Sequence, residues 1–470
     1  MCGAVGFVVA FAATAVARLG IPAPLTDVRL GTLQHVQRVL DRQPLYGVPT
    51  AAFVPLAYPP IYYYASAVAA ALIGNGYAAL RLTSLLSTFA TFALAATWTR
   101  HETGSWWAGV LAAGLYAATY RMTDAWFDVE RVDALYVALL IAGLYVLRRS
   151  ATTAGAAAAG FLFLLSALTK QSAWVMAGVL AIFLVAHARR RGLMFSATIA
   201  GGALASTALL TALAGRWYAF FVFGIGAHRY TLLGQSDRWL PSAYDVIVRE
   251  VILVVPFALL LVIWRFASGP RGFFTAAWCG TLAAALLTRL VQDSRVNVMM
   301  PVYAVTAVMT AVAAWDLLAR ARGSSNGTPR LVVLALCVAQ FAILAYVPWH
   351  LLQPFPGSNQ ETVLAVGGAE ADPRVTTRML AWNVAWRTPH ADVSATADFF
   401  AFAPPEVGRR FSDDLIQDLC LATRDRPFVV SALLFDRDWQ ETMASEIGRP
   451  LPLPATIDAA VARCGEAAVH

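Results

Sequence analysis

Eleven apolar stretches of 15–23 residues constrain this chain more than any other feature. A helix needs about 20 apolar residues to cross the hydrocarbon core of a bilayer, and in lipid only helices and closed barrels satisfy their own backbone groups. The pattern therefore predicts an α-helical polytopic membrane protein with about 11 transmembrane helices. The stretches cover residues 3–19, 77–99, 105–121, 132–147, 155–169, 172–187, 194–214, 246–264, 273–288, 298–318 and 331–347.

The composition excludes an ordinary soluble enzyme. Hydrophobic residues make up 59% of the 470 residues and charged residues 13%, whereas charged residues are about a quarter of a typical soluble domain. The net charge is +7, but the arginines lie mostly at the ends of the apolar stretches. There they indicate membrane topology and contact with lipid headgroups. We therefore expect the lipid bilayer as a partner and no nucleic acid.

The connectors between the stretches predict the orientation of the chain. With eleven spans, the arginines of the short connectors fall on one side of the membrane, and the positive-inside rule makes that side cytoplasmic. Most acids near helix ends lie on the opposite, outer side, so we expect the chemistry there. Residues 1–19 lack the basic start and cleavage site of a signal peptide, so we expect them to remain as a helix. The arginines are Arg100, Arg148, Arg149, Arg189, Arg190, Arg191, Arg265, Arg271, Arg320, Arg322 and Arg330.

The composition changes after residue 350, which predicts two domains. Residues 1–350 form a transmembrane domain with a large first outer loop over 20–76. Residues 351–470 have ordinary polarity, and we interpret them as a small soluble extracytoplasmic α/β domain. Ser412 is a plausible N-cap for a helix there. The expected strands are Thr362–Val366 and Phe428–Leu434, and the expected helices are Phe411–Ala422, Asp438–Gly448 and Thr456–Ala468.

The first outer loop carries a candidate catalytic acid. Asp27 follows the first apolar stretch by a few residues and precedes an amphipathic helix with its apolar face formed by Leu30, Leu33, Val36, Val39 and Leu40. This position would hold a carboxylate at the membrane surface, facing a lipid-borne substrate. A role as a helix N-cap, which Asp favours, has equal weight on position alone.

Later in the same loop, the block Pro60–Ile73 is only about 14 residues long, a length that favours an interfacial or re-entrant helix over a span. Tyr62, Tyr63 and Tyr64 suit the headgroup zone, with their rings in the apolar layer and their hydroxyls in water.

Three further polar clusters lie beside later apolar stretches. In the stretch 121–133, Arg131 and Asp133 lie at the mouth of a helix, where ionisable groups are costly and usually functional; for Asp124 a local salt-bridge network is the better interpretation. Lys170, the only lysine in the chain, could offer a compact positive charge to a phosphate or only snorkel from a helix end. The stretch 289–297 adds two arginines and an amide at another outer helix end.

The order of these motifs resembles a known family. After the acid come Pro44-Leu45-Tyr46, the run from Tyr58 to Tyr64, Arg81-Leu82-Thr83-Ser84, Arg131-Val132-Asp133 and Leu168-Thr169-Lys170. Over roughly residues 1–320 this order resembles the GT-C glycosyltransferases, specifically bacterial relatives of protein O-mannosyltransferases and of the lipid A aminoarabinose transferase (glycosyltransferase family 39-like). Arg295 and Asn297 before Met300-Pro301 look like the family's late outer-loop element.

The resemblance implies a polyprenyl-phosphate-dependent glycosyltransferase in the bacterial plasma membrane. A sugar would move from the lipid-linked donor to an extracytoplasmic hydroxyl on a lipid, glycan or protein. Asp27 corresponds to the general base, and a single base on the opposite face implies inversion at the anomeric carbon. Candidates for donor-phosphate binding are Lys170, Arg131 and Arg295. Candidates for substrate binding are Tyr58, Tyr62, Asp128, Glu130, Asp133 and Asn297.

The sequence departs from the family at two places. Val28 stands where the family often has a second acid, and Ala57 precedes Tyr58 where relatives often carry a lysine.

No cofactor is required, a divalent metal has no support, and no cysteine–histidine spacing suggests zinc. Cys420 and Cys464 in the tail either form a disulfide or stay free.

The rival function is a transporter or flippase for a lipid-linked cell-envelope precursor, a class that often shows internal repeats. The chain has no evident repeat, and its acids collect on one side. A non-catalytic assembly subunit is a third reading, in which Asp27 would vary without loss of function.

Overall fold

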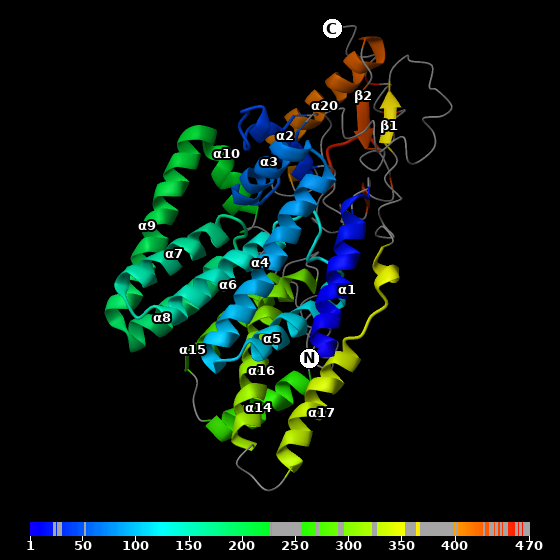
Figure 1. Cartoon of the computed structure of the whole chain (residues 1–470). Coiled ribbons are helices and arrows are strands. Elements are labelled where there is room, and N and C mark those ends of the chain that lie inside the picture. The colour runs from blue at the N-terminus through cyan, green and yellow to red at the C-terminus, as the bar shows by residue number, and fades with distance from the viewer. Residues whose placement is uncertain are drawn as a thin grey trace.

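The computed structural model in Figure 1 describes most of the transmembrane domain and parts of the tail. The described residues are 1–21, 25, 31–50, 53–225, 227, 255–268, 272–289, 296–321, 327–352, 363–366, 399–400, 403–425, 428–431, 437, 440–441, 444, 450–455, 459 and 463.

Each of the eleven apolar stretches overlaps a helix in this described part of the chain, as the sequence predicted. Membrane helices form there because an apolar segment in lipid must satisfy its backbone internally. The helices are α1 (Cys2–Leu19), α4 (Tyr77–Thr103), α5 (Trp106–Ala118), α6 (Asp133–Arg149), α7 (Thr153–Ala167), α8 (Ala173–His187), α9 (Arg189–Ala214), α14 (Val255–Ser268), α15 (Gly272–Arg289), α16 (Met300–Ala321) and α17 (Thr328–Ile343).

Among the described helices, four are long and apolar enough to cross a membrane. These are α1, α4, α9 and the continuous segment Val296–Ala321, whereas several others, such as α7 and α8, are apolar but shorter. The structure therefore supports a membrane protein with several apolar helices. The number of spans remains a prediction.

Helix α16 forms the centre of the bundle, where it packs against α4, α5, α14 and α15 and is buried along nearly its whole length. Small residues permit the closest helix contacts around it. A Cβ on Gly109 of α5 would lie 2.5 Å from the carbonyl oxygen of Ala96 in α4, and one on Gly114 would lie 2.3 Å from Ala4 in α1. Helix α5 is therefore wedged directly against the backbones of α4 and α1.

The first loop begins and ends at the same face of the bundle. Arg81, near the start of α4, donates to the carbonyls of Arg18 and Ile21 at the end of α1, at 3.0 and 2.6 Å. Two short helices lie between, α2 (Gly31–Leu40) and α3 (Ile61–Ile73), and Figure 1 shows both at the upper end of the bundle. Helix α3 thus forms where a short helix was predicted, and it does not carry the chain across the bundle.

The prediction of solvent-facing hydroxyls on Tyr62 and Tyr63 is wrong. Helix α3 packs on α2 and α4, so both tyrosines point into the protein and are fully buried. The Tyr62 hydroxyl donates to the carbonyl of Leu80 at 3.0 Å and lies 3.2 Å from Ser84 Oγ. Only Tyr64, 48% exposed, faces outward.

The described tail lies at the same end as the first loop (Figure 1). Strands β1 (Val363–Val366) and β2 (Phe428–Ser431) pair antiparallel with Val363 opposite Ser431, which confirms strands at the two predicted places. Phe399 packs against Phe220 and Phe221, which lie in η2 (Phe220–Gly224), a π-helical turn that follows α10 (Arg216–Ala219).

Helix α20 (Pro405–Asp425) contains the predicted helix Phe411–Ala422 but begins earlier. Ser412 is therefore inside the helix, not at its N-cap, and its hydroxyl donates to the carbonyl of Pro452. The predicted helices at Asp438–Gly448 and Thr456–Ala468 lie largely outside the described residues. A self-contained α/β domain remains a prediction.

Candidate active site

The connector between α5 and α6 brings four charged side chains into the protein interior. It begins with a short 3₁₀ turn, η1 (Arg121–Thr123), and Asp124 and Ala125 then adopt left-handed conformations with φ of 51° and 57°. After this sharp turn the chain contacts α1 and α4. Asp124 remains exposed, whereas Asp128, Glu130, Arg131 and Asp133 are buried.

Asp128 is held by α1. Arg18 Nη1 donates to Asp128 Oδ1 at 2.9 Å and to the carbonyl of Ala125 at 3.0 Å, and the Tyr120 hydroxyl donates to the same carboxylate oxygen at 2.7 Å. Burial raises the pKa of Asp128, against the opposing effects of the Arg18 guanidinium and the Tyr120 hydroxyl. With these partners, Asp128 joins α1 to the connector.

Glu130 joins the connector to α4 and to the first loop. Arg81 Nε donates to its Oε2 at 2.8 Å, and the backbone amide of Leu25 donates to its Oε1 at 2.6 Å. Leu25 precedes Asp27 by two positions in the sequence. Because Arg81 also binds the end of α1, one buried ion pair fixes α1, α4 and the beginning of the first loop together.

Asp133 is the centre of a third, mixed-charge cluster. Lys170 Nζ donates to Asp133 Oδ1, and Asn297 Nδ2 donates to the same oxygen at 2.8 Å. Arg131 Nε lies 3.8 Å from Asp133 Oδ2, and Arg131 Nη2 donates to the Tyr58 hydroxyl at 2.6 Å. The cluster holds two cations and one acid, so its formal charge is positive.

Four segments supply these five side chains, and local contacts hold the segments in place. Lys170 lies in the turn between α7 and α8, where Gln171 Nε2 donates to the carbonyls of Ala57 and Val222 at 2.6 and 3.0 Å. The Tyr46 hydroxyl donates to the carbonyl of Tyr58 at 2.6 Å. Asn297 belongs to the 3₁₀ turn η5 (Val296–Met299) that begins α16. The cluster is therefore built on fixed helix ends.

The structure brings together some of the predicted site residues and separates others. Arg131, Asp133, Lys170, Asn297 and Tyr58 form the cluster around Asp133. Two of the remaining candidates, Asp128 and Glu130, lie in the neighbouring ion pairs. A third, Tyr62, is buried beside Ser84 on α4, away from solvent. The last two, Asp27 and Arg295, lie outside the described residues.

The buried partner Arg18 was missed by sequence analysis. The available signal was a charged residue within an apolar stretch, which usually has a specific partner. Among the described residues, no group of three or more His, Cys, Asp or Glu side chains could hold a metal ion.

Comparison with solved structures identifies the fold. ArnT from Cupriavidus metallidurans bound to undecaprenyl phosphate matches with a TM-score of 0.51 at 16% sequence identity, covering 74% of this chain and 74% of that one. The chain has the GT-C fold. The apo state of the same ArnT matches with a TM-score of 0.49 at 14% identity, covering 74% of this chain and 75% of that one.

An oligosaccharyltransferase from Archaeoglobus fulgidus, in complex with Zn and sulfate, matches with a TM-score of 0.45 at 12% identity. The match covers 74% of this chain and 57% of the oligosaccharyltransferase. No protein-family model matches the chain, and no curated protein matches it.

Proposed function

We propose that this chain is a membrane glycosyltransferase that moves a sugar from a polyprenyl-phosphate donor to an acceptor hydroxyl. The observation that carries the proposal is the cluster of Arg131, Lys170 and Asn297 around Asp133. These residues come from distant parts of the sequence and meet at the face where the first loop begins and ends. The GT-C fold adds support by analogy, because ArnT was solved with undecaprenyl phosphate bound.

The chemistry assigns one role to each kind of group. Asp27 is the general base that takes the proton of the acceptor hydroxyl. The acceptor oxygen bonds to the anomeric carbon while the bond from that carbon to the phosphate oxygen breaks, so polyprenyl phosphate leaves and the configuration inverts. Lys170, Arg131 and Arg295 stabilise the negative charge that grows on the phosphate. No step is assigned to a metal.

Lys170 is suited to this role although it is paired with Asp133. An ammonium group has three donors, and the carboxylate uses one of them. Asp133 thereby fixes the position of Lys170, while Arg131 and Lys170 together exceed the charge of the single acid. The Arg131 guanidinium also lies 4.6 Å over the Trp126 ring, which holds it in place.

Glu130 supports the assignment of Asp27 through the backbone. Its carboxylate binds the amide of Leu25 at 2.6 Å, and two residues of chain extend at most about 7 Å. A base on this segment would therefore act close to a backbone position that the buried Arg81–Glu130 pair holds in place.

We place the active site and the tail on the extracytoplasmic side of a bacterial plasma membrane.

Purified protein supplied with a polyprenyl-phosphate sugar and an acceptor hydroxyl tests the proposal. A transferase releases polyprenyl phosphate only when the acceptor is present. The rival, a flippase, moves a lipid-linked precursor across proteoliposomes without releasing the sugar. Translocation without release would replace the proposal with the rival function. The absence of both, across lipid, glycan and peptide acceptors, would favour a non-catalytic assembly subunit.

A further inference from the structure

Two hydrogen bonds join the first loop to the turn between α7 and α8. Gln171 Nε2 donates to the carbonyl of Ala57 at 2.6 Å, and the amide of Ile61 donates to the carbonyl of Leu168 at 3.1 Å. Ala57 and Ile61 stand on either side of Tyr58 in the sequence. The position of Tyr58 therefore depends on the turn.

The turn itself is held by its own helices. The amide of Lys170 donates to the carbonyl of Ser166 in α7 at 2.9 Å, and the amide of Ala173 in α8 donates to the carbonyl of Lys170 at 3.2 Å. The amide of Trp174 likewise donates to the carbonyl of Gln171 at 3.0 Å. The Gln171 side chain thus projects from a backbone that is fixed on both sides, which makes it a rigid anchor.

The first loop lacks such internal support. Residues 54–60, all of which the structure describes, form no helix or strand, so their backbone groups need partners elsewhere. Side chains supply two of these partners: Gln171 binds the carbonyl of Ala57, and the Tyr46 hydroxyl binds the carbonyl of Tyr58 at 2.6 Å. Two consecutive carbonyls beside the cluster are therefore placed by side chains.

Both donors of the Gln171 carboxamide are used. The nitrogen has two N–H groups, and it also donates to the carbonyl of Val222 in η2 at 3.0 Å. A π-helical turn such as η2 is rare and often lies at a functional site. Phe399 of the tail packs against Phe221 of the same turn. One side chain therefore connects the α7–α8 turn, the first loop and the turn that supports the tail.

Tyr58 in turn orients Arg131. Arg131 Nη2 donates to the Tyr58 hydroxyl at 2.6 Å, and the guanidinium carbon lies 5.6 Å from the centre of the Tyr58 ring. Because a guanidinium is planar and its donors form a rigid fork, the direction of one N–H group fixes the directions of the others. A displaced Tyr58 hydroxyl would therefore turn the whole fork.

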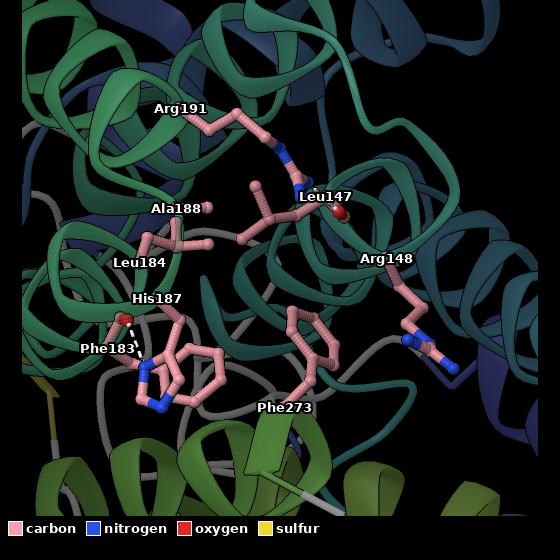
Figure 2. Close-up of a pocket in the computed structure, with 8 residues that line it drawn as sticks. All are labelled: Leu147, Arg148, Phe183, Leu184, His187, Ala188, Arg191 and Phe273. Atoms are coloured by element: carbon pink, nitrogen blue, oxygen red, sulfur yellow. Dashed lines mark hydrogen bonds between the residues drawn. The ribbon is translucent and has the colours of Figure 1, made fainter.

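Two other arginines of the bundle are oriented by helices alone. Figure 2 shows Arg148 and Arg191 beside a hollow between α6, α8, α9 and α15. Arg148 donates to both carboxylate oxygens of Glu102 in α4 at 2.7 and 2.9 Å, and Arg191 donates to two carbonyls at the end of α6. Arg131 differs because one of its partners, Tyr58, belongs to an irregular loop. Its orientation therefore depends on how that loop is held.

We propose that Gln171 is a positioning residue of the donor-phosphate site. It holds the first loop so that the Tyr58 hydroxyl turns the Arg131 guanidinium toward the phosphate, and it acts without touching the donor itself. This role rests on the proposed function, in which Arg131 stabilises the charge on the phosphate.

The test measures the affinity of the purified full-length protein for radiolabelled polyprenyl phosphate. Gln171→Met keeps the length of the side chain and removes both donors. It should therefore weaken binding roughly 10-fold, the smallest effect expected from loss of a hydrogen bond to a charged group. Gln43→Met, at an exposed glutamine of the first loop, is the matched control and should leave the affinity unchanged.

A double-mutant cycle separates positioning from general stability. Tyr58→Phe removes the hydroxyl that orients Arg131 and should also weaken binding roughly 10-fold. Because Gln171 acts through this hydroxyl, adding Gln171→Met to Tyr58→Phe should cause less than about a twofold further loss. Independent contributions would instead multiply to about 100-fold, and that result would overturn the proposal.

Hydrogen exchange reports the same role without any ligand. In Gln171→Met the amide of Ile61 should exchange at least about 10-fold faster, whereas the amide of Lys170, bonded within the α7–α8 turn, should keep its protection. Equal loss of protection at both amides would make Gln171 a general stabilising residue and would also overturn the proposal.

A second variant covers the case in which Gln171→Met fails to fold. Gln171→Glu keeps the shape but places a carboxylate against two carbonyls, so it should reproduce the loss of affinity. Unchanged affinity in both variants would overturn the positioning role alone. An unmodified protein that binds no polyprenyl phosphate would overturn the proposed function and this role with it.

Discussion

Arg81 donates from Nε to Oε2 of Glu130 at 2.8 Å, and both side chains are buried. The remaining oxygen of Glu130 accepts from the Leu25 amide, and Arg81 also binds the carbonyls of Arg18 and Ile21. The pair therefore does more than neutralise two charges. It joins the end of one helix, the start of another and the segment that leads to the proposed base.

Glu130→Gln should destabilise the protein far more than Glu102→Gln. Removing one partner of a buried ion pair costs about 3–5 kcal/mol because the other charge stays buried. The Glu102–Arg148 pair at the other end of the bundle is partly exposed, and such pairs contribute about 0–1 kcal/mol. Thermal unfolding followed by tryptophan fluorescence measures both variants against the unmodified protein. Equal shifts would mean that the Arg81–Glu130 pair contributes no more than a surface pair.

The positions of the helices could be predicted from the sequence because the requirement is local. Apolar runs of sufficient length become helices in lipid wherever they occur. The short length of Pro60–Ile73 was by itself enough to predict a short helix. The cluster around Asp133 was also foreseen in part, because each of its charged members stands at the end of an apolar stretch.

The pairing of these charges could not be predicted. Arg18 and Asp128 are separated by 110 positions, and nothing local selects that partner over Asp133 or Glu130. The burial of Tyr62 depended on α3 packing onto α4, a tertiary contact that outweighs the preference of tyrosine for a wet interface. Sequence periodicity identifies the elements, whereas the partner of a buried charge is decided by packing.

Lys170→Ala should weaken binding of polyprenyl phosphate by roughly 10–150-fold, the effect of losing one charge-assisted hydrogen bond. Lys170→Arg should restore binding only in part, because a planar guanidinium cannot occupy the site of a compact ammonium beside Asp133. Binding of radiolabelled polyprenyl phosphate to purified protein gives the affinities. Arg121→Ala, an exposed arginine at the same end, is the control for surface charge. Unchanged affinity in Lys170→Ala would leave the lysine as a structural partner of Asp133.

Asp27→Asn should reduce turnover by about 10²–10⁴-fold while donor binding and expression stay near normal, because the amide keeps the shape but cannot accept the proton. Asp41→Asn is the matched control, since Asp41 is exposed, lies in the same loop and accepts a hydrogen bond from Gln37 Nε2 at 3.0 Å. Release of polyprenyl phosphate over time measures both. Near-normal turnover in Asp27→Asn would remove that residue from the mechanism.

The tail should be reached from outside the cell. Figure 1 places α20 and the first loop at one end of the protein and the N-terminus toward the other. A membrane-impermeant thiol reagent should therefore label Cys420 or Cys464 in intact cells after reduction, and Cys2 only after permeabilisation. Mass spectrometry of the labelled peptides reports each site. The reverse pattern would place the tail and the cluster around Asp133 in the cytoplasm, where an extracytoplasmic acceptor could not be used.

The first loop should also lose stability in mild acid because of His35. The imidazole is fully buried and stacks on Tyr63 with ring centroids 4.4 Å apart. Its Nε2 accepts from the Leu56 amide at 3.2 Å, so the proton is on Nδ1, which donates to the carbonyl of Gly31 at 2.6 Å. Burial lowers the pKa of His35 to about 3.

When the first loop opens by local unfolding, His35 meets water and regains its ordinary pKa of about 6.5. Between pH 6.5 and 3 the opened loop therefore binds a proton that the closed loop does not. The free energy of opening is at its full value above pH 6.5 and falls by about 1.4 kcal/mol per pH unit below it. From pH 8 to pH 5 the protection factors of the amides in α2 should fall roughly 30-fold by hydrogen exchange. His35→Gln should abolish this slope, whatever it does to stability at neutral pH, and His350→Gln, at an exposed position, should retain it. An unchanged slope in His35→Gln would assign the acid sensitivity to another group.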